Sequence, residues 1–519
     1  MRVARPHVPC AASVYGVSAA VLMVASIPGA KAQADFQFRV NAALPALGFG
    51  FGQPSLGLAT AAAERDLMTF VWSESFITPL ILPLCPRTCD GFSITETFGG
   101  GQDQRVRLLS RRFSSSGAPL NGDVEVASTV AFPASARQQD GPLLMSSTSV
   151  RRAAPPAFAG PSAWRTVWWD QWSWIPQAPD APCGVTCDAQ PADWRTRLWP
   201  TFGADPGIVE PGECQGVVPS TAYSASRDII AWRDILAPCR VLRYRINDTP
   251  APGGLVLRAH AAGKDVDRPC AAAGLADRFV AAWREISLAD QTSTTNVTRV
   301  DPPWVAPGAV VVVDASVGAG PAVAAFDDGS FAVQYIRPTS PTTSALLVQL
   351  FSAAEPPAAV GGPITIEPLY NAALRFTISV TGPGVNDASS RIGTAYEVGD
   401  PARGPIDIVG RQVRPVSRRV GAAVRIPDQT TPPTTVLGEM HQHTAALRSD
   451  GRLATTFVWS GDSSVYCSVR TLPPPTCPGD FNGDGMVNFQ DLNLVLSGFG
   501  STYTFADLNL VLSNFGGTC

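Results

Sequence analysis

The chain has 519 residues, with 39 Lys and Arg against 43 Asp and Glu, and a formal net charge of −4 at pH 7. A mildly acidic chain lacks the basic surface that nucleic acid or an anionic membrane requires, so we expect neither as a partner. Only 16% of the residues are charged, while 46 Gly and 47 Pro interrupt a sequence rich in β-branched residues. This composition excludes a disordered chain and favours a mainly β fold.

Residues 1–32 have the features of a secretory signal peptide. Arg2 and Arg5 precede an apolar run over about residues 11–27, and the segment Ala-Lys-Ala follows at 30–32. A basic segment, an apolar segment and a small-x-small cleavage site are typical of such peptides. We therefore expect cleavage after Ala32, or alternatively after Ala34, and a protein that is secreted to the extracellular space or the cell surface.

No transmembrane segment is expected in the mature chain. No later stretch of about 18 residues lacks both charge and Gly or Pro breaks, as a spanning helix would. The nearest candidate, 309–323, contains Asp314, Gly318 and Pro321 and fits buried strands better. Cleavage of the signal peptide removes three positive charges, which takes the formal net charge from −4 to −7.

Ten cysteines remain after cleavage, and an even number in an exported protein predicts disulfide bonds. They are Cys85, Cys89, Cys183, Cys187, Cys214, Cys239, Cys270, Cys467, Cys477 and Cys519. We expect Cys477 and Cys519 to join the two ends of the carboxy-terminal segment, and Cys214 to pair with Cys239. The two C-x-x-x-C pairs could form local loops, cross-pair or hold zinc, and their connectivity stays open.

The body, residues 33–471, repeats one pattern: an alternating apolar strand that ends near an aromatic residue. The instances are 67–72, 166–169, 228–232, 279–283, 331–335, 376–380 and 453–459. Strand, turn and strand at a period of about 45–60 residues indicate radial β repetition. Seven instances predict a seven-bladed β-propeller, with tandem β-sandwiches as the alternative. We expect residues 33–40 to complete the last blade beside 453–459, so that the ring has no exposed edge.

The body pattern weakly resembles degenerate bacterial β-propeller repeats, which read roughly D-G-x-F-V-V-x-W. The segments Asp327-Asp328-Gly329 and Asp450-Gly451 carry the turn part of this likeness. Between about residues 150 and 215 we expect a Trp- and Cys-rich insertion, with seven tryptophans between Trp164 and Trp199. These side chains could form a packed insertion or a platform for sugar rings.

Residues 472–476 form a Pro-rich linker, and the loop that follows has the residue types of a calcium-binding loop. Its oxygen-bearing ligands occupy positions 1, 3, 5, 7, 9 and 12 of an EF-hand-type loop. The predicted ligands are Asp480, Asn482, Asp484, Met486 through its backbone carbonyl, Asn488 and Asp491. Gly485 at position 6 permits the sharp bend. Because several carboxylates repel each other without a cation between them, we expect folding of this segment to depend on calcium.

Behind the loop, the stretch 491–500 recurs almost unchanged as 507–516. Each copy places four apolar residues at i, i+3, i+4 and i+7, which is one face of a helix. These residues are Leu492, Val495, Leu496 and Phe499 in the first copy, and Leu508, Val511, Leu512 and Phe515 in the second. We expect the two helices to pack face to face.

Residues 477–519 resemble a type I dockerin, a pair of calcium-loop-plus-helix repeats. The likeness is nearest to the GC-type dockerin-like tails of secreted planctomycete-like bacterial proteins, with Cys477 before the loop and Cys519 at the end. The second repeat has only 501–505 where a second loop would be, so one ion is expected. The resemblance implies a cohesin-like partner or attachment at the cell surface.

Two functions are compatible with these features. In the first, a secreted binding body is docked or anchored by its calcium-stabilised tail. In the second, the body is a polysaccharide-degrading glycoside hydrolase carried by the tail. No G-x-S-x-G, H-E-x-x-H or nucleotide-binding motif occurs, and no catalytic residue is assigned. His441 and His443 could form half of a metal site, but the sequence gives no obvious carboxylate partner for the pair. The first function is favoured, with a polysaccharide as a possible ligand.

Overall fold

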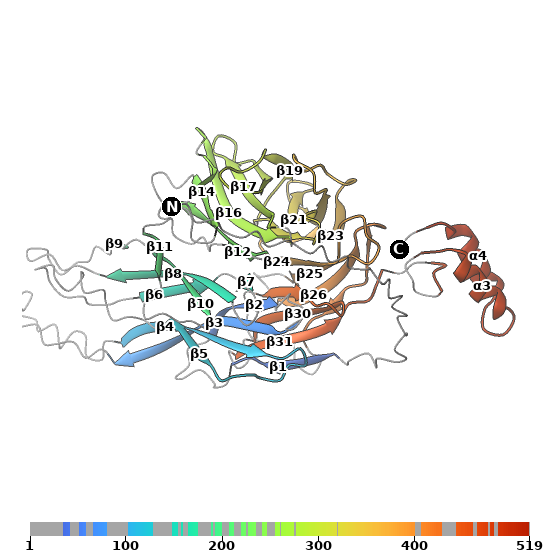
Figure 1. Ribbon diagram of the computed structural model, residues 1–519, viewed down its shortest axis with the longest axis horizontal. Helices are drawn as coiled ribbons and strands as arrows, with labels where there is room; N and C mark the ends of the chain where they lie inside the picture. The colour runs from blue at the N-terminus through green and yellow to red at the C-terminus, as the bar shows by residue number, and fades with distance from the viewer. Residues whose placement is uncertain are drawn as a thin grey trace, which may run out of the picture. The chain divides into compact units, whose positions relative to one another are not determined.

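The computed structural model describes residues 35–41, 51–58, 66–79, 102–127, 148–153, 157–158, 164–174, 188–189, 193–199, 207–211, 220–224, 227–234, 241–246, 255–259, 261–274, 277–318, 320–399, 406–427, 443–459, 464–475, 478–481 and 486–517. The expected signal peptide lies outside these ranges. Residues Phe36–Cys519 form one compact unit. The described part is mainly β, as the composition predicts, with two helices near its carboxy end (Figure 1).

Three consecutive sheets each contain four antiparallel strands in chain order. The first is β12 (Ser220–Tyr223), β13 (Asp228–Asp234), β14 (Val241–Ile246) and β15 (Leu255–Arg258). The second is β16 (Lys264–Ala273), β17 (Phe279–Ser287), β18 (Ser293–Val300) and β19 (Val311–Ala315). The third is β20 (Ala322–Ala325), β21 (Phe331–Pro338), β22 (Ser344–Phe351) and β23 (Ile364–Tyr370).

The next sheet has five strands: β24 (Phe376–Thr381), β25 (Arg391–Val398), β26 (Asp407–Arg414), β27 (Arg419–Val420) and β28 (Val424–Arg425). The last sheet joins the two ends of the body in the order β1-β31-β30-β29. Its strands are β29 (Thr444–Leu447), β30 (Arg452–Trp459), β31 (Ser464–Thr471) and β1 (Phe36–Arg39). The expected amino-terminal strand therefore completes the last sheet, but its direct neighbour is β31, with Phe36 opposite Val469.

The amino-terminal third forms one larger sheet made of two antiparallel groups. The first group is β2 (Phe51–Leu58), β3 (Met68–Pro79), β4 (Gln102–Phe113) and β5 (Val124–Ala127). The second is β6 (Thr148–Ala153), β7 (Ala157–Phe158), β8 (Trp164–Trp174), β9 (Asp188–Ala189), β10 (Asp193–Trp199) and β11 (Gly207–Pro211). A parallel pairing of Gln104 with Thr148 connects the groups. The expected Trp-rich insertion falls in the second group, and its side chains lie outside what the structure describes.

The first strands of the sheets, with β7 taking this place in the second amino-terminal group, touch one another in a series that returns to its start. Along this series, β2 contacts β29, which contacts β24, followed by β20, β16, β12 and β7, and β7 contacts β2 again. The hydrophobic cores lie between consecutive sheets. For example, Val280 of β17 clusters with Val333 of β21, and Ile336 of β21 clusters with Ile392 of β25. Most sheets are therefore buried on both faces by their neighbours.

One strand position is aromatic and buried in most sheets. This aromatic residue lies four positions after an apolar residue of the second strand and is at most 1% exposed. It is Trp72, Trp283, Tyr335, Tyr396 or Phe457, depending on the sheet. The place of this aromatic residue on the second strand shows that one predicted instance of the repeat was assigned to the wrong strand. The segment 376–380 is a strand, β24, but it is the first of its sheet, and the equivalent of the other instances is β25.

The turn before the second strand also recurs. In four sheets, the residue two positions before this apolar residue has a positive φ. These four residues are Asp66 (63°), Asp277 (52°), Gly329 (85°) and Gly451 (83°). Positive φ is most easily adopted by Gly, and Asp tolerates it because its short side chain can hydrogen-bond locally. The repeat therefore recurs in the backbone conformation of this turn as well as in the apolar residues of the strand.

Two of these turns are linked by an aspartate to the corresponding turn of a neighbouring sheet. The Asp66 carboxylate accepts the backbone N–H of Ser449 at 2.8 Å and also the Ser449 hydroxyl. In the same way, Asp277 accepts the hydroxyl of Ser224. These bonds connect neighbouring sheets at the level of their first turns.

A buried carboxylate, Glu285, connects β17 to β15 and β16 through two cations that are 30% and 49% exposed. Burial by itself raises the pKa of Glu285, but hydrogen bonds from Lys264 and Arg258 outweigh it and lower that pKa below its usual value. The Glu285 carboxylate lies 2.5 Å from Lys264 Nζ and 2.8 Å from Arg258 Nη2.

Not every cysteine of the expected even set is in a disulfide. Cys270 on β16 and Cys467 on β31 are free thiols. Cys467 is fully buried among apolar side chains of the last sheet and its neighbour, where a small apolar side chain fits the core. The other eight cysteines, including the expected pair Cys477 and Cys519, lie outside the described residues.

Helices α3 (Phe489–Ser497) and α4 (Phe505–Asn514) pack together near the carboxy end (Figure 1). They match the two predicted helices. Among the residues that the structure describes, no helix is both long and apolar enough to cross a membrane.

Candidate functional sites

Four of the six predicted calcium ligands are described: Asp480, Met486, Asn488 and Asp491. The other two, Asn482 and Asp484, lie outside the described residues, as does the bend at Gly485. No group of three or more His, Cys, Asp or Glu side chains that could hold a metal occurs in the described ranges. The calcium site therefore stays a prediction, and its fit is judged from the residues present.

The last residue of the predicted loop folds back onto the first. Asp491 is fully buried, and one oxygen of its carboxylate accepts the N–H of Phe481 at 2.8 Å. The other oxygen accepts the N–H of Asn488 at 2.9 Å. Because Phe481 directly follows Asp480, the backbone at predicted position 1 lies beside the carboxylate at predicted position 12. Carboxylate and amide oxygens are the ligands that Ca²⁺ prefers, so the residue types present fit the ion.

Asn488, a predicted calcium ligand, is also the N-cap residue of helix α3. Its side-chain oxygen accepts the N–H of Gln490 at 2.6 Å, and Asp491 bonds its backbone in return. This capping box satisfies helix N–H groups that have no partner within the helix. The second repeat has the same box: both the N–H and the hydroxyl of Thr504 donate to Asp507. These bonds hold the pKa of Asp507 below its usual value.

The helix pair has a smaller core than the apolar stripes predict. Val495 and Val511 are fully buried and pack with Val487, while Leu492 and Leu508 are partly buried. The remaining stripe residues face outward: Leu496 is 51% exposed, Leu512 54%, Phe499 42% and Phe515 42%.

Two aromatic pairs lie at opposite ends of the helix pair. Phe489 at the start of α3 meets Phe515 after α4 at 4.9 Å between ring centroids, and Phe505 at the start of α4 meets Phe499 after α3 at 5.6 Å. The pairs are related by the repeat. They place an apolar, uncharged surface on the outside of the tail, which is typical of an interaction site.

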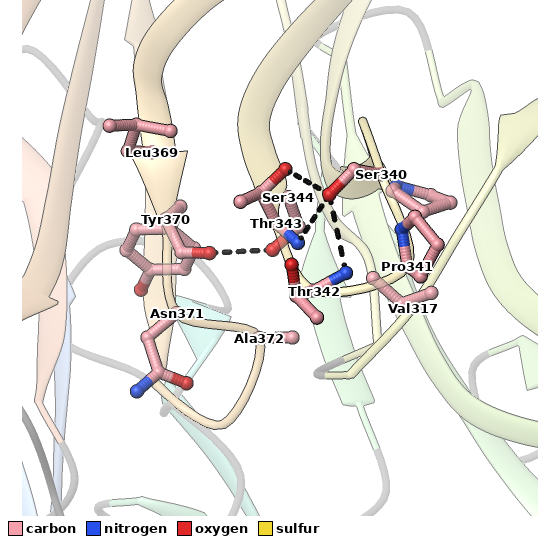
Figure 2. A pocket seen from close by; sticks show the side chains of 11 residues that line it. Val317, Ser340, Pro341, Thr342, Thr343, Ser344, Leu369, Tyr370, Asn371 and Ala372 are labelled. Atoms are coloured by element: carbon pink, nitrogen blue, oxygen red, sulfur yellow. Dashed lines mark hydrogen bonds between the residues drawn. The ribbon is translucent and has the colours of Figure 1, made fainter.

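A second candidate site is a pocket of about 610 Å³ in the body. Figure 2 shows that two connections face each other across it: the turn between β21 and β22, at 338–344, and the end of β23 with residues 371–372. Val317, which precedes β20, closes a third side. No sequence motif marks these residues, because the three segments come together only through strand pairing.

The pocket is uncharged. Its polar groups are hydroxyls and one amide, from Ser340, Thr342, Thr343, Ser344 and Asn371, beside apolar residues. Burial raises the pKa of the lining tyrosine, residue 370, well above its usual value, so its phenol stays neutral.

His443 is placed differently from the sequence-based alternative of a histidine metal site. It is buried, its Nε2 lies 3.1 Å from the carbonyl oxygen of Ala395, and its Nδ1 lies 3.6 Å from Glu397 Oε1. A ring nitrogen beside a carbonyl oxygen must donate a proton, so Nε2 is engaged in the fold. The other histidine, His441, lies outside the described residues. The partner carboxylate of Glu397 was not foreseen, because it is distant in sequence.

No family model matches the chain, and no curated protein does. Among solved structures, the chain is similar to a protein of unknown function from Dyadobacter fermentans, with 12% identity and a TM-score of 0.37 over 72% of this chain and 98% of that one. It is also similar to a leech intramolecular trans-sialidase, with 8% identity and a TM-score of 0.38 over 67% of this chain and 65% of that one. The intramolecular trans-sialidase of Ruminococcus gnavus gives 9% identity and 0.36, over 67% and 90%. At this level of similarity none of their activities transfers to this chain.

Proposed function

We propose that the body is a seven-bladed β-propeller. The contact series of first strands, from β2 through β29 and back through β7, supports this arrangement over tandem sandwiches. In a row of sandwiches the first and last sheets would have no reason to touch. Here β2 contacts β29, and the amino-terminal strand β1 pairs into the last sheet. Burial of most sheets on both faces supports the same reading.

For the tail, we propose a dockerin-like domain that one calcium ion stabilises. Asp480 and Asp491 would hold the ion together with Asn482, Asp484 and the Met486 carbonyl, and Asn488 would contact it through water. When bound, the ion would neutralise the loop carboxylates. The chain itself closes the loop through Asp491 and caps both helices. The exposed, uncharged face of the helix pair supports a role in docking to a cohesin-like or cell-surface partner.

The function that these parts support best is that of a secreted or cell-surface protein that binds polysaccharide through its body and docks or anchors through its tail. The observation that carries the docking half is the exposure of several large apolar side chains on the helix pair, because an exposed apolar surface is typical of an interaction site. Polysaccharide hydrolysis by the body is the alternative from the sequence, and it predicts released sugar.

The test uses the full mature chain on insoluble plant and algal polysaccharides, with retention and released sugar measured together. A second arm measures retention on bacterial cells with calcium and with chelator. Retention on a polysaccharide without released sugar, together with calcium-dependent retention on cells, is expected. Released sugar would replace the binding function with the enzymatic one. Chelator-insensitive retention on cells would overturn the role of the tail.

A further inference from the structure

The uncharged pocket in the body has the size of a small-molecule site. Its volume of about 610 Å³ falls within the range of roughly 300–1,000 Å³ that such sites occupy. It lies at the connections that leave the outer strands β19 and β23 and at the turn between β21 and β22. Sites on connections that a rigid sheet scaffold positions are a common way to build binding into a β fold.

The walls of the pocket are held in place before any ligand arrives. In the turn, the Ser340 hydroxyl accepts the N–H of Thr343 at 3.0 Å and bonds its hydroxyl at 2.7 Å (Figure 2). Across the pocket, the Ser344 hydroxyl donates to the Tyr370 carbonyl at 2.5 Å. The Tyr370 phenol is itself used, because it donates to the Arg375 carbonyl at 2.7 Å. A preformed wall lowers the ordering cost of binding.

The third side is fixed by a close backbone approach. Gly318 has φ +67°, and a Cβ atom there would lie 2.0 Å from the Ala372 carbonyl oxygen. Val317 beside it donates its N–H to the Ile336 carbonyl at 3.0 Å. The segment that bears Val317 is therefore bonded to β21 and lies closely against the segment that bears Asn371.

Two polar groups of the pocket have no hydrogen-bond partner within the described part of the chain: the hydroxyl of Thr342 and the amide nitrogen of Asn371. The Asn371 oxygen is occupied, because it accepts the N–H of Ala373 at 3.0 Å. Beside them, Leu369 is 75% exposed. The pocket therefore offers hydroxyl and amide hydrogen bonds next to an apolar surface, and no charge.

We propose that this pocket binds one neutral, hydroxyl-rich sugar unit of a glycan. An uncharged wall cannot offset the desolvation of an ionic ligand, so acidic sugars and phosphates are disfavoured. The hydroxyls of a neutral sugar pair with Thr342 and Asn371, and its C–H face packs against Leu369. The inference rests on the proposed binding function of the body and names the site and the ligand class.

Isothermal titration measures the affinity of the full mature chain for soluble neutral oligosaccharides and for an acidic polysaccharide, polygalacturonate. Asn371→Ala and Thr342→Val should each weaken binding of the neutral oligosaccharide at least tenfold. Thr292→Val is the matched control, because this exposed threonine sits in the equivalent turn of the preceding sheet, between β17 and β18. It should leave the affinity unchanged. Thermal unfolding checks that all three variants fold.

The outcomes separate this inference from the proposed function. If the chain binds neutral glycans and neither pocket variant weakens binding, the body binds elsewhere and the pocket assignment is wrong. Preference for the acidic polymer would also overturn it, while leaving a binding body in place. A chain that binds no glycan in either assay would overturn both.

Discussion

Replacing the buried aspartate that closes the tail loop, Asp491→Ala, should open the tail while leaving the body folded. Its carboxylate is fully buried and accepts two backbone N–H groups, one from Phe481 and one from Asn488. Alanine removes both acceptors and also half of the capping box of helix α3. The two ends of the loop would then lose the group that holds them together.

The magnitude follows from the bonds that are lost. A buried donor left without a partner costs about 1–3 kcal/mol, and loss of a cap costs about 0.5–2 kcal/mol. Because the donors are only partly buried and can recover some hydration, we expect a total of about 2–4 kcal/mol. The core of the tail is three valines, so a loss of this size is enough to unfold it locally.

Hydrogen exchange of the full chain measures this directly, because local opening reports its own free energy. Amides of 489–497 should exchange roughly 30- to 1,000-fold faster in Asp491→Ala than in the unmodified chain. Addition of calcium should slow exchange in the unmodified chain and have no effect in the variant. Amides of the body should exchange at unchanged rates in both.

Asp507→Ala is the matched control, since Asp507 holds the same position in the second helix. It is partly exposed and, within the described ranges, its side chain bonds only to Thr504. Its effect should be clearly smaller and should not alter the response to calcium. Equal effects of the two substitutions would refute the reasoning from burial, and a calcium response that survives in Asp491→Ala would remove that residue from the ligand set.

Three further outcomes are expected. Gly318→Ala should lower the unfolding free energy by about 3 kcal/mol or more, and Gly263→Ala by only about 1–2 kcal/mol. Both glycines have a positive φ, but only at Gly318 would the new Cβ atom clash with backbone atoms. Equal shifts in thermal unfolding would contradict this. A double-mutant cycle of Asp66→Ala and Ser449→Ala should give a coupling of about 1–2 kcal/mol, whereas additive effects would mean that the turn contact is not stabilising. The pKa of Glu285 is lowered in the folded chain, so the contribution of this carboxylate to the unfolding free energy is present above its unfolded pKa and is lost as pH falls through its folded pKa. From about pH 6 to 3, the unfolding free energy should therefore fall less in Glu285→Gln than in the unmodified chain. Parallel pH curves of the two chains in urea unfolding would disprove this.

Much of the strand content can be predicted from local pattern. An apolar residue followed four positions later by an aromatic marks a second strand at Phe279, Phe331 and Leu453, and these segments are strands with buried aromatics. The segment at 376–380 was misassigned as an equivalent of these strands, although the residue four positions after Phe376 is Val380 and not an aromatic. Its side chains alternate like those of a second strand, and only pairing with β25 makes it the first of its sheet.

The two helices behind the loop were also predictable, because a period of 3.6 residues is a local property. How much of each stripe is buried was not. Val495 and Val511 meet at the contact between α3 and α4, while Leu496 and Leu512 lie one position further round and remain exposed. Helix periodicity identifies a face but not the width of the surface that a partner helix covers.

Chain-local chemistry thus determined where most strands and the two tail helices lie, and which residue types form the predicted calcium loop. Only the packed chain decided that β1 pairs with β31 instead of β30, that Glu397 faces His443, and that Thr342 and Asn371 share a pocket. Propensity and periodicity act over a few neighbouring residues. Contacts between segments far apart in sequence depend instead on strand order and on which apolar faces meet.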